Sequence, residues 1–116
     1  MKILLVVYDN GSHIPWFPQG LAYIAAALLQ AGHEVEIYNQ DVHHYPDEHL
    51  TAYLDGQAFD VVGVGVIAGY YQYRKLLKIS SAINHSKRRP LYVIGGHGPS
   101  PEPEFFLKKT GSVIYF

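Results

Sequence analysis

The chain has 116 residues, enough for one domain with one core, and its formal net charge of −1 favours no strongly charged partner such as nucleic acid. It contains no cysteine, which excludes disulfides, thiolate metal sites, iron–sulfur ligation and a cysteine nucleophile within this sequence. No apolar run approaches the roughly twenty residues of a membrane span, and Asp9 and Asn10 end the first run too early for a secretory signal. We therefore expect a cytoplasmic protein.

The first third of the chain alternates strand and helix patterns. Residues 2–8 form a nearly unbroken aliphatic run, which is typical of a strand covered on both faces. A helix is predicted over 18–31, with Gly32 as its C-cap. Its expected buried face carries apolar residues at helical spacing: Leu21, Ile24, Ala25, Leu28 and Leu29. Residues 33–38 alternate apolar and polar, which favours an edge or half-exposed strand.

The stretch 39–48 is polar and rich in histidine, and we interpret it as a solvated loop. The stretch and the residue after it contain side chains of the types that bind metals: Asp41, His43, His44, Asp47, Glu48 and His49. Their spacing matches no closed metal site, so no metal site is predicted.

The same periodicities continue to the end of the chain. In order, they predict a short helix carrying Leu50, Tyr53 and Leu54, a central strand over 60–67, a helix over 71–85, a strand over 91–94, a helix over 101–109 and a strand over 112–116. The helix over 71–85 is expected to bury Tyr73, Leu76, Leu77 and Ile83.

Alternating strands and helices imply right-handed crossovers and a parallel sheet. The predicted fold class is therefore α/β, a three-layer flavodoxin-like (Rossmann-like) arrangement with a five-stranded sheet in the order 2-1-3-4-5. No helix is expected after the fifth strand, so one sheet face is expected to be partly uncovered. We interpret the chain as a fragment of a longer protein, with homodimerisation through that face as an option.

Three loops of unusual composition follow strands one, three and four, at the sheet edge where open α/β folds bind their ligands. They offer bare backbone, aromatic side chains and few charges, which suits a large, flat, mostly apolar ligand better than a nucleotide triphosphate. We predict binding residues from these loops and from the third strand: Asn10, Gly11, Ser12, His13, Trp16, Gly65, Ile67, Ala68, Gly69, Tyr70, Gly95, Gly96, His97, Gly98 and Pro99. No catalytic residue is assigned.

The glycine cluster within 95–99 is the clearest of these signals. Glycine lets another molecule press against the main chain, and Ser100 and Pro101 then supply a helix N-cap and a first helical position. Neither a Gly-x-x-x-x-Gly-Lys-Ser/Thr phosphate loop nor a Gly-x-Gly-x-x-Gly after the first strand is present.

Several segments, in this order and spacing, resemble the N-terminal cobalamin (B12)-binding domain of cobalamin-dependent radical S-adenosylmethionine enzymes. The segments are 2–7, 18–25, 32–35, 60–66 and 93–100. The resemblance implies a corrin ring at the carboxyl edge of the strands, with its nucleotide tail beside the sheet and Gly95 and Gly96 giving it access to the backbone. On this interpretation Gly96→Val is expected to abolish cobalamin retention and leave the fold intact.

The chain departs from the Asp-x-His-x-x-Gly signature of related cobalamin domains, since Asp9 is followed by Asn10, Gly11, Ser12 and His13. The resemblance therefore implies base-off cobalamin without a histidine ligand. It also implies that residues 1–116 are a carrier module with no turnover of their own. S-adenosylmethionine and an iron–sulfur cluster would belong to a partner radical domain. Three alternatives stay open: the N-terminal Rossmann-like domain of a glycosyltransferase, a flavodoxin-like FMN protein, and a structural or interaction domain with an empty cleft.

Overall fold

The computed structural model describes residues 1–116 except 12–13, 16, 67–69, 97–101, 113 and 116. In chain order its elements are β1 (Lys2–Val7), α1 (Gln19–Gln30), β2 (Glu34–Asn39), α2 (Gln40–His43), α3 (Asp47–Gly56), β3 (Val61–Gly65), α4 (Tyr70–Asn84), β4 (Leu91–Gly95), α5 (Pro103–Thr110) and β5 (Ile114–Tyr115). None of the described helices is long and apolar enough to cross a membrane.

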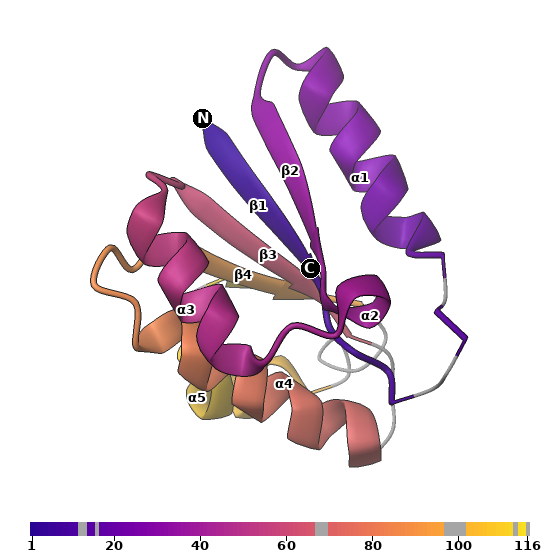
Figure 1. Ribbon diagram of the computed structural model, residues 1–116, viewed down its shortest axis with the longest axis vertical. Helices are drawn as coiled ribbons and strands as arrows, with labels where there is room; N and C mark the ends of the chain where they lie inside the picture. The colour runs from indigo at the N-terminus through magenta and orange to yellow at the C-terminus, as the bar shows by residue number, and fades with distance from the viewer. Residues whose placement is uncertain (12–13, 16, 67–69, 97–101, 113, 116) are drawn as a thin grey trace.

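The strands form one parallel sheet in the order β2-β1-β3-β4-β5, which confirms the predicted flavodoxin-like arrangement (Figure 1). β1 is central, because Leu5 pairs with Ile37 of β2 on one side and with Gly63 of β3 on the other. β2 is an edge strand, as its alternating pattern predicted. β5 is described over Ile114–Tyr115, within the predicted 112–116, and residues 113 and 116 lie outside the described residues.

The two faces of the sheet are covered unequally. One face packs against α3, α4 and α5, which Figure 1 shows together on one side of the sheet. The largest fully buried side chains of this core include Leu4, Leu50, Leu54, Leu76, Ile79, Ile83 and Ile94. On the opposite face α1 packs against β1, and a smaller core joins Ile3, Leu5 and Ala25.

The predicted buried face of α1 was only partly correct. Ala25 is buried and Leu21 and Leu28 are partly buried, but Ile24 is 39% exposed and Leu29 is 57% exposed. The reason is that α1 meets the sheet with one narrow side. Its sequence, Gln19–Gln30, contains no charged residue, so the outer surface of the helix is apolar or uncharged all round.

Element boundaries differ from the prediction in two other places. The stretch interpreted as a loop contains the helical turn α2, and α5 begins at Pro103 instead of residue 101. The predicted cap residues Ser100 and Pro101 lie outside the described residues. In α4, Leu76 and Ile83 are buried as predicted, whereas Tyr73 and Leu77 are only half-buried, as is Tyr53 in α3.

Candidate functional site

The carboxyl ends of β1, β3 and β4 meet at one edge of the sheet, where the sequence predicted the ligand site. Six of the predicted residues are described: Asn10, Gly11, Gly65, Tyr70, Gly95 and Gly96. The others lie outside the described residues: Ser12, His13, Trp16, Ile67, Ala68, Gly69, His97, Gly98 and Pro99. The geometry below therefore concerns the base of the three loops.

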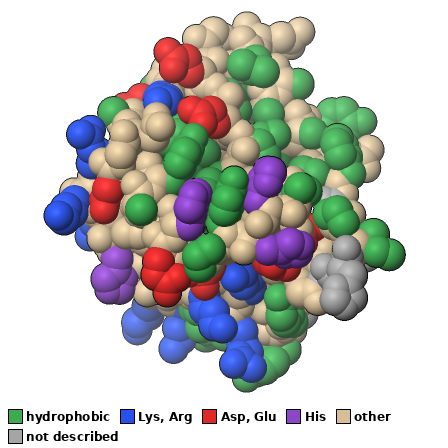
Figure 2. Space-filling model, in the orientation of Figure 1, with side chains coloured by type: hydrophobic (Ala, Val, Ile, Leu, Met, Phe, Trp, Pro, Cys, Tyr) green, Lys and Arg blue, Asp and Glu red, His purple; other side chains and the backbone are tan. Residues whose placement is uncertain are grey.

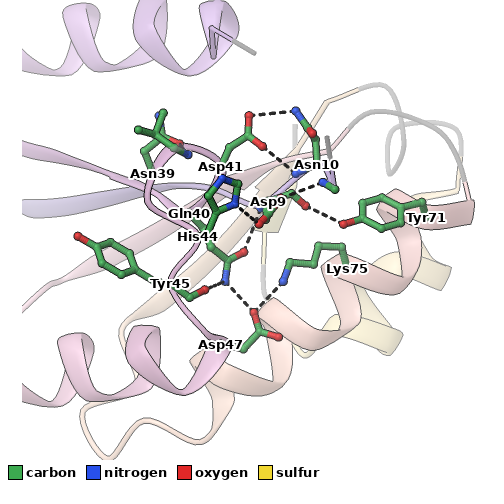
Figure 3. Close-up of polar contacts among 12 residues, drawn as sticks. Asp9, Asn10, Asn39, Gln40, Asp41, His44, Tyr45, Asp47, Tyr71 and Lys75 are labelled. Atoms are coloured by element: carbon green, nitrogen blue, oxygen red, sulfur yellow. Dashed lines mark hydrogen bonds and ion pairs between the residues drawn. The ribbon is translucent and has the colours of Figure 1, made fainter. Parts of the chain in front are cut away.

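The loop after β1 is held by two side chains from α2 (Figure 3). The backbone N–H of Asp9 donates to Oε1 of Gln40 at 3.0 Å. Asn10 donates twice to the carboxylate of Asp41, from its backbone N–H to Oδ1 at 2.9 Å and from Nδ2 to Oδ2 at 3.0 Å. β1 and β2 are neighbours in register, with Val7 opposite Asn39, so the residues that follow them meet at this edge.

Gln40 and Asp41 are buried, with 0% and 1% of their surface exposed, which contradicts the interpretation of this stretch as a solvated loop. Asn39 begins α2 by accepting the N–H of Val42 with its side chain, and this turn directs the next two side chains inward. Nothing in the sequence indicated that Gln40 and Asp41 are buried, because the N–H groups that donate to them lie 31 residues earlier in the chain.

Further bonds tie Gln40 to the start of α3. Its Nε2 donates to the carbonyl of Tyr45 at 2.9 Å and to Oδ1 of Asp47 at 2.8 Å. The same Asp47 oxygen accepts from Nζ of Lys75 on α4 at 2.9 Å. Burial raises the pKa of Asp47, but the bonds from Lys75 and Gln40 lower it more, so its pKa lies below the usual value.

Asp9 organises the loop around its own carboxylate. Oδ1 accepts the backbone N–H of Gly11 at 2.8 Å, and Oδ2 lies 2.7 Å from Nδ1 of His44. His44 adopts a left-handed conformation, with φ of 54°, at the end of α2. Burial raises the pKa of Asp9, but the bonds to His44 and Gly11 outweigh it, so its pKa is lowered and the carboxyl is ionised at neutral pH.

A glycine is needed at position 11 because the Tyr71 side chain packs against its backbone. The Tyr71 hydroxyl donates to the carbonyl of Asp9 at 3.1 Å. Gly11 has a φ of +79°, and a Cβ placed there would lie 2.7 Å from the Tyr71 oxygen. The predicted Gly11 is therefore explained by local packing between the loop and α4. Burial and the nearby Asp9 charge raise the pKa of Tyr71, which keeps its hydroxyl protonated as a donor.

Gly96 is fixed by backbone packing between β3 and β4. Its φ is +105°, and a Cβ there would lie 2.4 Å from the carbonyl oxygen of Val66. The Val66 N–H also donates to the carbonyl of Gly95 at 2.8 Å, so the two chains are in close contact. The expectation that Gly96→Val leaves the fold intact was therefore wrong, since a valine side chain has no space at this position.

Gly65 and Gly95 lie opposite each other at the ends of β3 and β4. A Cβ on Gly65 would meet only the Leu21 side chain of α1, at an ordinary 3.6 Å. Gly65 therefore lies on the face covered by α1, and neither steric contact nor a positive φ requires a glycine there. Gly65 is half-buried and Gly95 is buried, so the two give the ends of β3 and β4 a stretch of backbone without side chains next to the exposed Gly96.

The first two turns of α4 form a basic and aromatic surface beside this edge. A cavity of about 290 Å³ is lined by Tyr70, Tyr71, Arg74, Lys75 and Lys78. Figure 2 shows Lys and Arg side chains along the lower edge of this view and histidines across its middle. Within the described ranges, no group of three or more His, Asp or Glu side chains is arranged to hold a metal ion.

The family model for the B12 binding domain matches residues 10–116 of the chain. The search of curated proteins found no match to the chain. Among solved structures, the chain is similar to the radical S-adenosylmethionine methyltransferase TsrM from Kitasatospora setae with cobalamin and a 4Fe–4S cluster bound. The TM-score is 0.71 and the identity 25%, over 96% of this chain and 23% of that one.

A second TsrM structure from Kitasatospora setae, with tryptophan substrate and the S-adenosylmethionine analogue aza-SAM bound, has a TM-score of 0.72 at 24% identity. It covers 96% of this chain and 22% of that one, and at this identity the likeness concerns the fold. The chain thus spans less than a quarter of the length of either matched protein.

Proposed function

The chain belongs to the B12-binding domain family, and we propose on this basis that it binds cobalamin at the carboxyl edge of its parallel sheet. The observation that carries the proposal, beside the family match, is the run of backbone without side chains at the paired strand ends Gly65 and Gly95, which continues into the exposed Gly96. A large flat ring needs such a surface, because each additional side chain would hold it away from the backbone.

The described residues at this edge have the properties that a large flat cofactor requires. Tyr70 is 76% exposed at the start of α4 and offers an aromatic ring at the edge. The backbone at Gly65, Gly95 and Gly96 would support the ring or its tail, together with the predicted loop residues outside the described ranges. When bound, cobalamin supplies a cobalt centre that carries a methyl group or takes part in radical chemistry.

We further propose that the bound form is base-off and lacks a histidine ligand. The support is in the sequence of the first loop, where Asn10, Gly11 and Ser12 stand between Asp9 and His13. The usual Asp-x-His spacing is therefore absent. In addition, Asp9 already pairs with His44 of the same edge, so this carboxylate is engaged within the protein.

Residues 1–116 act, in this proposal, as a carrier module for a radical S-adenosylmethionine domain that holds its own iron–sulfur cluster. The support is the structural similarity to TsrM, in which the matched region makes up 23% of the chain. On the face covered by α1, Leu91 of β4 is 44% exposed, which leaves part of this face open to a partner domain or a second copy. The family match does not favour the glycosyltransferase and FMN alternatives.

The proposal is tested by titrating the chain with hydroxocobalamin and with methylcobalamin, followed by desalting and absorption spectroscopy. We expect retained cobalamin with the spectrum of a base-off form. Absence of retention, under anaerobic reducing conditions as well, would show that the proposal is wrong.

Gly65→Val replaces Gly96→Val as the informative variant, because its Cβ meets only the flexible Leu21 side chain. We expect it to weaken cobalamin binding by about tenfold or more, since ~1.4 kcal/mol of lost contact is enough for that change. Gly56→Val is the matched control, because a Cβ at Gly56 meets nothing within 4 Å and the residue ends α3. Equal affinity of both variants and the unmodified chain would contradict the assigned surface.

A further inference from the structure

The exposed face of α4 carries a small cavity whose lining combines two aromatic rings with three cations. The cavity has a volume of about 290 Å³ and is lined by Tyr70, Tyr71, Arg74, Lys75 and Lys78. Residues four apart on a helix lie above one another, so this spacing places all five side chains on adjoining parts of one helix face. The volume lies near the lower end of the range for ligand sites, which indicates a small ligand.

The charges at this cavity favour an anion. Nζ of Lys75 lies 2.9 Å from Oδ1 of Asp47, so its charge is compensated within the protein (Figure 3). Arg74 and Lys78 are exposed, and neither forms an ion pair with any of the described residues. These two cations are separated by about one helical turn, so both head groups can reach a single anionic group. A group with two negative charges therefore matches the cavity.

The other end of the cavity, closer to the carboxyl edge of the sheet, is aromatic. The Tyr71 hydroxyl donates to the carbonyl of Asp9 at 3.1 Å, which holds its ring in place while the residue stays 45% exposed. The guanidinium of Arg74 lies over the ring of Tyr70, 5.9 Å from its centroid. A guanidinium placed by a ring keeps its N–H donors for an anion. The aromatic residues thus offer a surface for a ring and also position a cation.

We propose that this cavity binds a small aromatic phosphate monoester, with its phosphate between Arg74 and Lys78 and its ring against Tyr70 and Tyr71. A phosphate monoester carries a charge of about −1.5 to −2 at pH 7, which the two exposed cations can balance. The inference goes beyond the proposed function, because the cavity is on α4, on one face of the sheet, whereas Gly65 faces Leu21 of α1 on the other.

The neighbouring carboxylates determine the orientation of the ligand. Three of them act on the Tyr71 hydroxyl: Asp9, Asp41 and Asp47. Burial and these negative charges raise the pKa of Tyr71, so an anionic group is repelled from this end of the cavity. Arg74 and Lys78 lie about one and two helical turns further along α4. The phosphate is therefore expected at the two cations and the uncharged ring at the tyrosines.

The experiment follows backbone amides of the cobalamin-free chain by two-dimensional NMR during titration with phenyl phosphate, at neutral pH and an ionic strength held constant with sodium chloride. We expect saturable shifts at residues 70–78. Inorganic phosphate lacks the ring, so we expect it to bind about threefold or more weakly. Phenyl sulfate keeps the ring but has one negative charge, so it should also bind more weakly than phenyl phosphate. If either probe binds as tightly as phenyl phosphate, the proposed ligand class is wrong.

Two variants remove the proposed phosphate contacts at exposed positions, where substitutions have little effect on stability. We expect Arg74→Gln to weaken phenyl phosphate binding by about tenfold or more, because a charge-assisted and bidentate contact is lost. Lys78→Gln should cause a smaller loss, since lysine binds phosphate as a point charge. The double variant is expected to show no saturable shift at residues 70–78.

The matched control is Arg89→Gln, which removes the same charge from another exposed arginine. Arg89 lines a cavity of about 410 Å³ near the start of β4, where its Nη2 donates to Oδ1 of Asn84 at 3.4 Å. We expect this variant to leave the response of residues 70–78 to phenyl phosphate unchanged. A loss of affinity equal to that of Arg74→Gln would mean that the response depends on net charge alone, and would overturn the proposal.

The proposal is also overturned if phenyl phosphate causes no saturable shift at residues 70–78 of the unmodified chain, or if Arg74→Gln binds it equally tightly. We expect Arg74→Gln to retain cobalamin as the unmodified chain does. A parallel loss of cobalamin would assign the cavity to the cobalamin edge and refute a separate site. The phenyl phosphate titrations need no cobalamin, so their outcome is independent of the proposed function, which the hydroxocobalamin titration tests by itself.

Discussion

Replacing Gly65 or Gly96, at the carboxyl ends of β3 and β4, by alanine is expected to change the unfolding free energy in opposite directions. Gly65→Ala places a Cβ 3.6 Å from Leu21, in ordinary contact, and removes backbone freedom from the unfolded chain, so we expect a gain of about 0.4–1 kcal/mol in unfolding free energy. Gly96→Ala must adopt a φ of +105° and places its Cβ 2.4 Å from the Val66 oxygen. Backbone strain alone costs about 1–3 kcal/mol there, before any displacement of β3.

The expected difference between the two variants is therefore about 1.4–4 kcal/mol, with opposite signs relative to the unmodified chain. The assay is equilibrium unfolding in urea, followed by far-ultraviolet circular dichroism and analysed by linear extrapolation. Gly20→Ala is a useful reference, since its Cβ meets nothing within 4 Å. If both variants shift the midpoint in the same direction, the conclusion that backbone geometry requires a glycine at position 96 and not at position 65 is refuted.

Other substitutions test the core and the edge. Leu76→Ala, at a fully buried site under the sheet, is expected to lower the unfolding free energy by about 2–5 kcal/mol in the same urea assay, and a loss under ~1 kcal/mol would contradict its place in the core. Ser80→Ala removes the 2.6 Å partner of the buried Tyr92 hydroxyl and is expected to cost about 1–3 kcal/mol; full recovery in Ser80→Ala with Tyr92→Phe would confirm the pairing. The lowered pKa of Asp47 contributes stability above the unfolded pKa, about 3.9, that is lost as pH falls through the folded value. Thermal unfolding from neutral pH to about pH 2 should thus show a shallower acid loss in Asp47→Asn than in the unmodified chain, and parallel curves would contradict this.

Strand order was predictable because the relevant signals are local and agree with one another. The continuous apolar runs at 2–8 and 60–67 became the central strands β1 and β3, and the alternating 33–38 became the edge strand β2. Helix faces were less predictable. Leu29 has the spacing of a buried residue but is 57% exposed, because periodicity gives the apolar side of a helix and not the width of its contact with the sheet.

The sequence predicted where the candidate site lies, but not which contacts hold its residues in place. Glycine composition pointed to the correct sheet edge, and Gly11 and Gly96 are there, but packing against Tyr71 and Val66 explains both. Asp41 was missed because an acidic residue in a polar stretch is normally solvated. Its hydrogen-bond partner Asn10 is 31 residues away in the sequence, at the end of the neighbouring strand, and a local sequence pattern cannot predict such a long-range pair.

The central position of β1 determines when the sheet can be completed during synthesis. β1 begins at Lys2, and one of its two neighbours, β3, begins only at Val61. Parallel pairing over such a separation closes a long loop, which makes it slow compared with local helix formation. While the chain emerges from a ribosome, the aliphatic residues of β1 therefore lack their second neighbour until residues 61–65 have been made. An unpaired strand edge of this kind is prone to aggregation, so the time until β3 pairs with β1 sets the interval in which the nascent chain is exposed to it.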